Sequence, residues 1–102
     1  MVKINLKDAE KQMVERLKKA GLERFIVHED FREKPEYPHK FATTVVLVKE
    51  GDAKHLIETD ISDGGIFRGR GTAYCSRKDA FNKRKGRVIA TARAMRNIEK
   101  YI

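Results

Sequence analysis

The side chains best able to do chemistry in this chain are eight basic residues spread between Arg68 and Arg87. Arg68 and Arg70 are two residues apart, so in a β-strand they point to the same face. Glycines at positions 69 and 71 would let a ligand approach the backbone of that strand closely. Arginine forks match the geometry of phosphate oxygens. The pattern therefore predicts a site for a phosphate-bearing anion.

A specific set of residues forms this expected site. The predicted phosphate ligands are Arg68, Arg70, Arg77, Lys78, Arg84, Arg87 and Arg93. The first four would form the anion cradle, helped by free amides at a helix start near Ser76. The last three would reach further phosphates or a base. Phe67 and Tyr74 flank the arginine pair and are candidates for stacking on a base, although strand alternation also permits Phe67 to face the core.

The distribution of charge supports this prediction. Residues 66–102 contain eleven Lys and Arg against two acids, a net of +9, whereas residues 1–65 contain twelve against thirteen, a net of −1. Charge concentrated in one part of a chain indicates a surface that meets an anion. The bland alternatives are a solvated basic face and, for the helical stripe of Arg93, Arg96 and Lys100, the flank of a dimer interface.

Length and composition restrict the class of protein. We expect 102 residues to form one domain, residues 1–102. The lone Cys75 permits no intramolecular disulfide, which is typical of a reducing, cytoplasmic protein. No apolar run approaches the ~20 residues needed to cross a bilayer, so no membrane partner is expected.

Residue patterns predict six elements of secondary structure. A helix is expected from Leu6 to Ala20, capped by Asn5. Strands are expected at Arg24–Phe31, Phe41–Lys49, Lys54–Ile61 and Ile66–Tyr74, with the β-branched run of the second making it central. A long helix is expected from a Ser-x-x-Asp cap at Ser76 to about Lys100, with one apolar face. The residues assigned to that face are Phe81, Val88, Ala92 and Met95.

These elements predict an α+β fold with the order α-β-β-β-β-α. Short turns between strands favour antiparallel pairing. The expected architecture is one antiparallel sheet of three to four strands, with both helices packed on one face. Gly86 interrupts the long helix, and it predicts either close packing on the sheet or a kink.

Signals for an enzyme are weak. His28, His39 and His55 lack the spacing of metal ligands, and Cys75 has no cysteine partner. Glu58, Asp60 and Asp63 could hold Mg²⁺, but acids on an exposed strand more often face solvent. We therefore expect no catalytic residue, no metal and no cofactor.

The segment Pro35-Glu36-Tyr37, His39, Phe41 and the following Val-rich strand is similar to part of a double-stranded RNA-binding domain. Gly71 followed by Ser76-Arg77-Lys78-Asp79-Ala80 extends the similarity. In that family a lysine-rich helix start grips phosphates. The spacing between Gly71 and Ser76 and the charged run from Lys83 to Gly86 depart from the family pattern.

The sequence also resembles small phage-encoded accessory proteins. The resemblance rests on Cys75-Ser76-Arg77-Lys78-Asp79-Ala80-Phe81 and on Gly86-Arg87-Val88-Ile89-Ala90-Thr91-Ala92-Arg93-Ala94. It implies a counter-defence factor in the host cytoplasm, and it assigns no ligand.

Three functions remain open from the sequence. The leading hypothesis is a non-enzymatic binding protein for a nucleotide or a nucleic acid. A small-nucleotide ligand would favour a homo-oligomer with a pocket between subunits, whereas nucleic acid would give a steep dependence on salt. The alternatives are an inhibitor or adaptor that binds an acidic host protein and, last, a metal-dependent enzyme that uses Glu58, Asp60 and Asp63.

Overall fold

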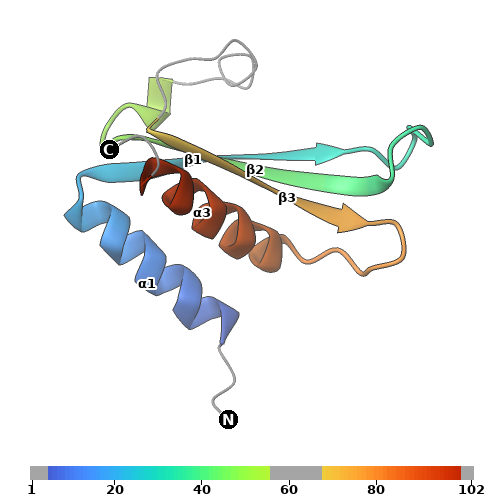
Figure 1. Ribbon diagram of the computed structural model, residues 1–102, viewed down its shortest axis with the longest axis horizontal. Coiled ribbons are helices and arrows are strands. Elements are labelled where there is room, and N and C mark those ends of the chain that lie inside the picture. Colours follow the sequence, from blue (N-terminus) through green and yellow to red (C-terminus); the bar gives the residue numbers. More distant parts are fainter. Residues whose placement is uncertain (1–4, 56–67, 100–102) are drawn as a thin grey trace.

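The computed structural model describes residues 5–55 and 68–99 of the chain. In these ranges the elements follow one another in the order α-β-β-β-α, with a short 3-10 turn before the last strand (Figure 1). The elements are α1 (Leu6–Lys19), β1 (Leu22–Asp30), β2 (His39–Lys49), η1 (Ala53–His55), β3 (Gly69–Ser76) and α3 (Lys83–Glu99).

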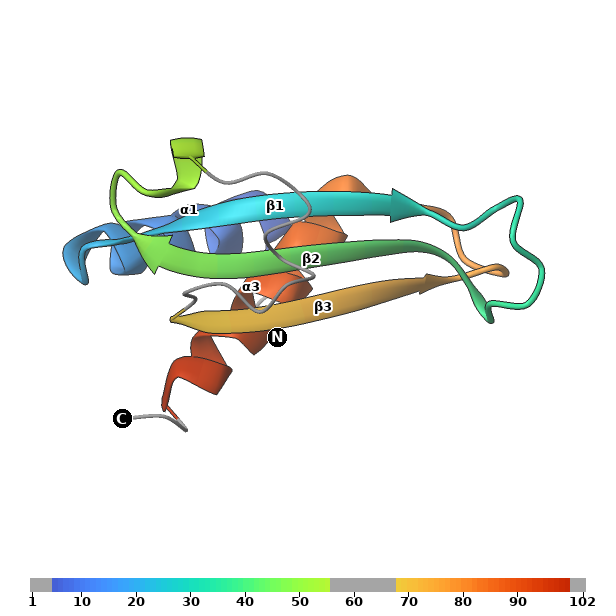
Figure 2. The same ribbon diagram turned by 90° about the horizontal axis from the view of Figure 1, so that it is seen from above.

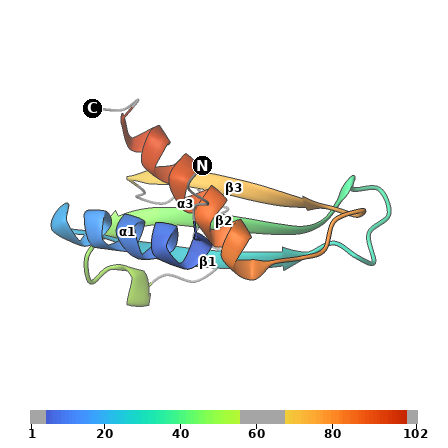
Figure 3. The ribbon, with the colours of Figure 1, turned by 90° about the horizontal axis from the view of Figure 1, so that it is seen from below.

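The three strands form one antiparallel sheet in the order β1-β2-β3. Val27 of β1 pairs with Thr44 of β2, and Val45 pairs with Gly71 of β3. Both helices lie on the same face of this sheet, with α3 crossing β2 and β3 and α1 beside it (Figures 2 and 3). The predicted α+β class and the antiparallel sheet with helices on one face are confirmed.

Local sequence explains where the first helix and the strands lie. Asn5 caps α1 as expected, because its Oδ1 accepts a hydrogen bond from the Lys7 amide at 2.9 Å. Gly21 leaves the helix with a positive φ of 72°. The β-branched run of β2 is buried on both faces and occupies the centre of the sheet. The fourth strand expected at Lys54–Ile61 begins within the 3-10 turn, and residues 56–61 lie outside the described ranges.

Small residues control how closely α3 approaches the sheet. A Cβ atom placed on Gly71 would overlap the backbone of Ala90 and Ala94, and one on Gly86 would lie 2.7 Å from Thr43 Oγ1. Gly86 therefore serves close packing, one of its two expected roles. The predicted apolar face of this helix was wrong, because small residues rather than large apolar ones make the contact. The fully buried residues of α3 are Ala90, Thr91 and Ala94.

The start of the last helix also differs from the sequence prediction. Ser76 ends β3, and α3 begins seven residues later at Lys83. Ser76 Oγ accepts a hydrogen bond from the Lys78 amide at 3.1 Å and so stabilises a turn. Asn82 takes the capping position, and its Oδ1 accepts from the Lys85 amide at 3.0 Å. Serine and aspartate bond to nearby amides in turns as readily as at helix caps, which explains the error.

Neither of the described helices is both long and apolar enough to pass through a bilayer.

Candidate anion-binding surface

Three arginines gather along the outer edge of the sheet, beside β3. Arg70 comes from the strand, whereas Arg93 and Arg96 come from α3, and together with Asn97 they line a shallow hollow open to solvent. All three arginines are exposed. We call Arg70, Arg93 and Arg96 the edge arginines.

The fold brings the edge arginines together through the packing of α3 on β3. Gly69, Gly71 and Ala73 turn toward the helix, so alternation points Arg70 to the opposite face of the strand. Arg93 Nη1 donates a hydrogen bond to the carbonyl oxygen of Thr72 at 2.6 Å. Thus α3 holds its arginines directly against the strand that carries Arg70.

Asn97 makes a second link between the same two elements. Its Nδ2 donates a hydrogen bond to the carbonyl oxygen of Arg70. Arg93 and Asn97 lie one helical turn apart, and their acceptors lie two residues apart on β3. The helix therefore runs alongside the strand in the opposite direction and bonds to alternate carbonyls along it.

No described acidic residue neutralises the edge arginines. In residues 5–55 and 68–99, the ion pairs involve only two carboxylates, Glu10 and Asp30. Their partners are Arg24, Arg32, Arg84 and Arg87. Like charges brought close together without a counterion favour the binding of an anion.

Two of the predicted phosphate ligands have a structural partner instead. Arg87 donates from Nε to Glu10 Oε2 at 2.8 Å and from Nη2 to Oε1 at 3.2 Å. Arg84 Nε lies 3.9 Å from Glu10 Oε1. Arg24 Nη1 donates to Glu10 Oε2 at 2.9 Å, so one carboxylate of α1 links β1 and α3.

The electrostatics of this cluster are strongly coupled. Hydrogen bonds from Arg87 and then Arg24 lower the pKa of Glu10 from 4.5 to about 2, against the opposing effect of its burial. The hydrogen bond with Glu10 in turn raises the pKa of Arg87. Nearby, burial lowers the pKa of His28, and the positive charges of Lys83 and Arg87 lower it further. These bases therefore belong mainly to the internal contact between α1 and α3.

Arg77 is also occupied by the protein itself. Its Nη2 donates to the carbonyl oxygens of Lys34 at 2.7 Å and Phe31 at 3.1 Å, and its Nε donates to Tyr37 O at 3.0 Å. A predicted phosphate ligand thus holds the loop between β1 and β2. Lys78 and Arg68 are exposed, and neither forms a described ion pair.

Tyr74 is the aromatic residue nearest to the edge arginines. It is 62% exposed and shares the margin of the hollow. Its ring centroid lies 4.6 Å from that of His39, which also contacts Phe31 edge-on at 4.7 Å. Phe67, the other predicted stacking residue, lies outside the described ranges.

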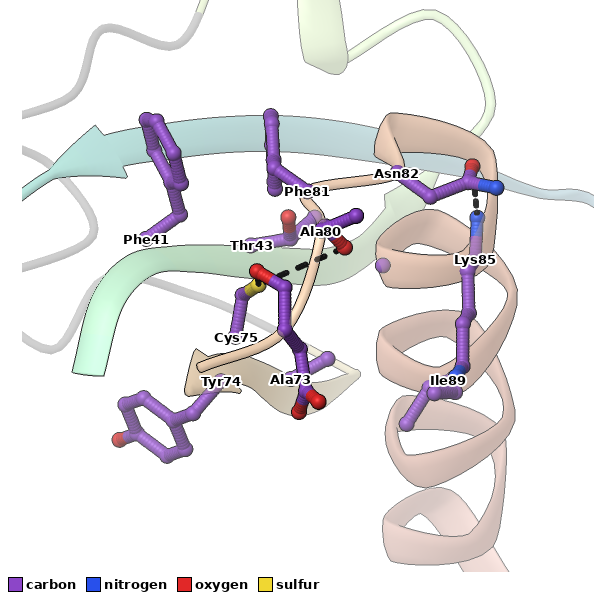
Figure 4. A pocket seen from close by; sticks show the side chains of 12 residues that line it. Phe41, Thr43, Ala73, Tyr74, Cys75, Ala80, Phe81, Asn82, Lys85 and Ile89 are labelled. Atoms are coloured by element: carbon purple, nitrogen blue, oxygen red, sulfur yellow. Dashed lines mark hydrogen bonds between the residues drawn. The ribbon is translucent and has the colours of Figure 1, made fainter. Parts of the chain in front are cut away.

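A separate apolar pocket of about 80 Å³ lies between β2, β3 and the start of α3 (Figure 4). Phe41 and Phe81 stack at its margin with centroids 4.1 Å apart. Cys75 contributes a thiol whose Sγ lies 3.6 to 3.9 Å from the carbonyl oxygens of Ser76, Asp79 and Ala80. The thiol is a weak donor to its own turn and has no base beside it to suggest a nucleophile.

The structure contains no cluster of three metal-ligating side chains within the part of the chain that it describes. Glu58, Asp60 and Asp63, the acids considered for Mg²⁺, lie outside that part. The hypothesis of a metal-dependent enzyme therefore gains no geometry here.

The structure changes the membership of the predicted site. It brings Arg70 and Arg93 together, adds Arg96 and Asn97, and gives Arg77 and Arg87 to internal contacts. The three- and four-residue spacing of Arg93, Arg96 and Lys100 was the available signal for Arg96. Nothing local marks Asn97, because its role depends on the edge of a distant strand.

Comparison with protein-family models, with curated proteins and with solved structures finds no match to this chain.

Proposed function

We propose that this protein binds nucleic acid, without catalysing a reaction, through the edge arginines. The observation that carries the proposal is the convergence of Arg70, Arg93 and Arg96 on one exposed hollow, with no carboxylate among the described residues to neutralise them. Guanidinium groups bind phosphate oxygens through paired hydrogen bonds. A polyanion can bridge several such groups at once.

The shape of the surface favours a polymer over a single nucleotide. Small ligands that bind tightly occupy concave sites that bury most of their surface. The hollow beside β3 is shallow, and its charged groups are spread over a strand and a helix. Successive phosphates of a nucleic acid would satisfy such a row, whereas one nucleotide would reach only part of it.

The resemblances noted in the sequence are compatible with this proposal but do not carry it. The α-β-β-β-α order is the order expected from the likeness to double-stranded RNA-binding domains. The lysine-rich helix start of that family has no equivalent at Ser76, because α3 begins at Lys83. The likeness to phage accessory proteins would place the binding in the cytoplasm of a host cell.

The test is a salt titration of binding to a fluorescent oligonucleotide, followed by anisotropy. Arg70→Gln with Arg96→Gln removes two charges whose side chains make no described internal bond. If both arginines contact phosphates of a single strand, the slope of log K against log salt becomes shallower by about 1.4. Lys18→Gln with Lys19→Gln removes the same charge from exposed positions at the end of α1 and should leave the slope unchanged.

Two results would contradict the proposal. One is equal weakening by both double variants, which would indicate diffuse attraction to the net charge of +8. The other is absence of oligonucleotide binding together with a protein complex that survives nuclease, which would favour an acidic protein as the partner. Arg87 is unsuitable for this test, since its loss would also break the contact with Glu10.

A further inference from the structure

Resting on the proposed function, we infer that the protein prefers nucleic acid with unpaired bases, and that Tyr74 is the platform on which a base stacks. Tyr74 is 62% exposed and lies on the same strand as Arg70. At ~3.3 Å per residue the two positions are about 13 Å apart along β3. An aromatic ring and a phosphate-binding group thus share one strand.

The ring of Tyr74 points away from the core. Ala73 packs in the core under α3, so alternation directs Tyr74 to the other face of the strand. Figure 4 shows the ring turned away from the apolar pocket that surrounds Phe41 and Ile89. The side chain therefore contributes little to the folded core and remains available to a ligand.

His39 holds this ring in place on one side. The two ring centroids are 4.6 Å apart with the planes tilted by 44°. His39 is itself held by Phe31 and Tyr37, at 4.7 Å and 5.6 Å. Arg77 then ties the backbone of this loop to the turn after β3. A ring already ordered by its neighbours loses little conformational freedom when a base stacks on it.

The position of the edge arginines fits a strand that runs along β3. Arg93 is anchored at the level of Thr72, between the positions of Arg70 and Tyr74. Arg96 and Asn97 lie toward the Arg70 end of the hollow. Phosphates placed on the arginines would leave a neighbouring base beside Tyr74. Basic grooves that follow a backbone, combined with aromatic stacking, are the general means of binding single strands.

A base inside a duplex cannot use this platform. Its faces are covered by the neighbouring base pairs, and a ring could reach them only by kinking the helix. The described helix next to the site does not stand clear of the protein either, since α3 lies flat against β2 and β3 (Figure 3). An α-helix that reads a duplex has to enter a major groove ~12 Å wide. These features favour an unpaired strand.

The experiment compares a single-stranded oligonucleotide with a blunt duplex of the same sequence and labelling, by fluorescence anisotropy at one salt concentration. The wild-type protein should bind the single strand at least about ten-fold more tightly than the duplex. Tyr74→Ala should weaken single-strand binding by about five-fold to a hundred-fold, because one base–aromatic stack is worth ~1–3 kcal/mol. Tyr74→Phe should retain the affinity. Tyr37→Ala removes another exposed tyrosine, 40% exposed, and is the matched control.

Tyr74→Leu guards against an effect on folding, since it preserves apolar bulk at the same exposed position. It should weaken single-strand binding nearly as much as Tyr74→Ala and leave thermal unfolding unchanged. The inference is overturned if the duplex binds as tightly as the single strand, or if Tyr74→Ala and Tyr74→Leu bind like the wild type. If Arg70→Gln with Arg96→Gln still weakens binding in that case, the proposed function stands alone. If the wild-type protein binds neither oligonucleotide, both proposals fail.

Discussion

Arg93 crosses from α3 to the edge of the sheet, where its Nη1 lies 2.6 Å from the carbonyl oxygen of Thr72 and donates a hydrogen bond to it. The bond has two consequences. It orders a guanidinium whose remaining donors can meet a ligand, and it occupies an acceptor on an edge strand. Asn97 occupies the carbonyl oxygen of Arg70 in the same way.

This arrangement predicts that Arg93 and Asn97 protect the edge of β3 from pairing with other chains. Open carbonyls on an edge strand invite β-sheet association. Arg93→Ala combined with Asn97→Ala should therefore increase self-association, measured by light scattering over a range of protein concentrations. Arg96→Ala removes a charge from the same surface without exposing a carbonyl, and it should remain as dispersed as the wild type. Equal association of both variants would assign the effect to lost charge repulsion.

The close contact between β3 and α3 predicts that Gly71 cannot be replaced. The added methyl group of Gly71→Ala would overlap the backbone of Ala90 and Ala94, so the helix would have to move. We expect a loss of about 3 kcal/mol in the free energy of unfolding, measured by urea denaturation. A variant as stable as the wild type would contradict the observed separation of helix and strand.

Gly86→Ala is the informative comparison for this substitution. The new methyl group would meet the Thr43 side chain, with Oγ1 at 2.7 Å, rather than backbone. Replacing glycine in a helix interior also contributes ~1 kcal/mol of stability. These opposing effects should leave Gly86→Ala within about 1 kcal/mol of the wild type.

The sequence predicted the elements whose formation depends on local residues. The β-branched run from Thr43 to Val48 identified the central strand, and Asn5 with Gly21 marked both ends of the first helix. The last helix was less predictable. Its contact face consists of small residues, so apolar periodicity pointed to the wrong side, and its Ser76 cap proved to be a turn.

The candidate site shows a different limit of sequence reasoning. Basic residues were located correctly, but their employment depends on contacts between distant parts of the chain. Glu10 lies 77 residues before Arg87, and Phe31 lies 46 before Arg77. Local spacing contains no sign of such pairs. The charge pattern therefore identified a basic region, and only the fold separated the edge arginines from those that hold the protein together.

Glu10 should make the stability of the fold depend on acidity. Its pKa is about 2 in the folded protein and 4.5 without its partners. The stabilisation is therefore fully present above about pH 4.5 and is lost as the pH falls toward 2. Glu10→Gln should lower the free energy of unfolding at pH 7 by about 2 kcal/mol, since it leaves Arg24 and Arg87 without their carboxylate.

Urea unfolding from pH 7 to pH 2 measures both effects. The wild-type protein should lose stability between pH 4.5 and 2, and Glu10→Gln should lose much less over that interval. Glu15→Gln changes an exposed acid of the same helix that forms no described ion pair, so it should match the wild type. Identical pH profiles for Glu10→Gln and the wild type would show that the cluster does not hold α1 in place.

Arg77 permits a separation of structural and binding roles by one conservative change. Arg77→Lys keeps the charge but loses the planar fork that donates to the carbonyl oxygens of Phe31, Lys34 and Tyr37. We expect faster amide hydrogen exchange at Lys34 and Tyr37, whose amides close the turns of this loop. Oligonucleotide affinity should fall less than two-fold, because the charge is retained and the edge arginines are untouched. A large loss of affinity with unchanged exchange would instead place Arg77 on a phosphate, as the sequence alone suggested.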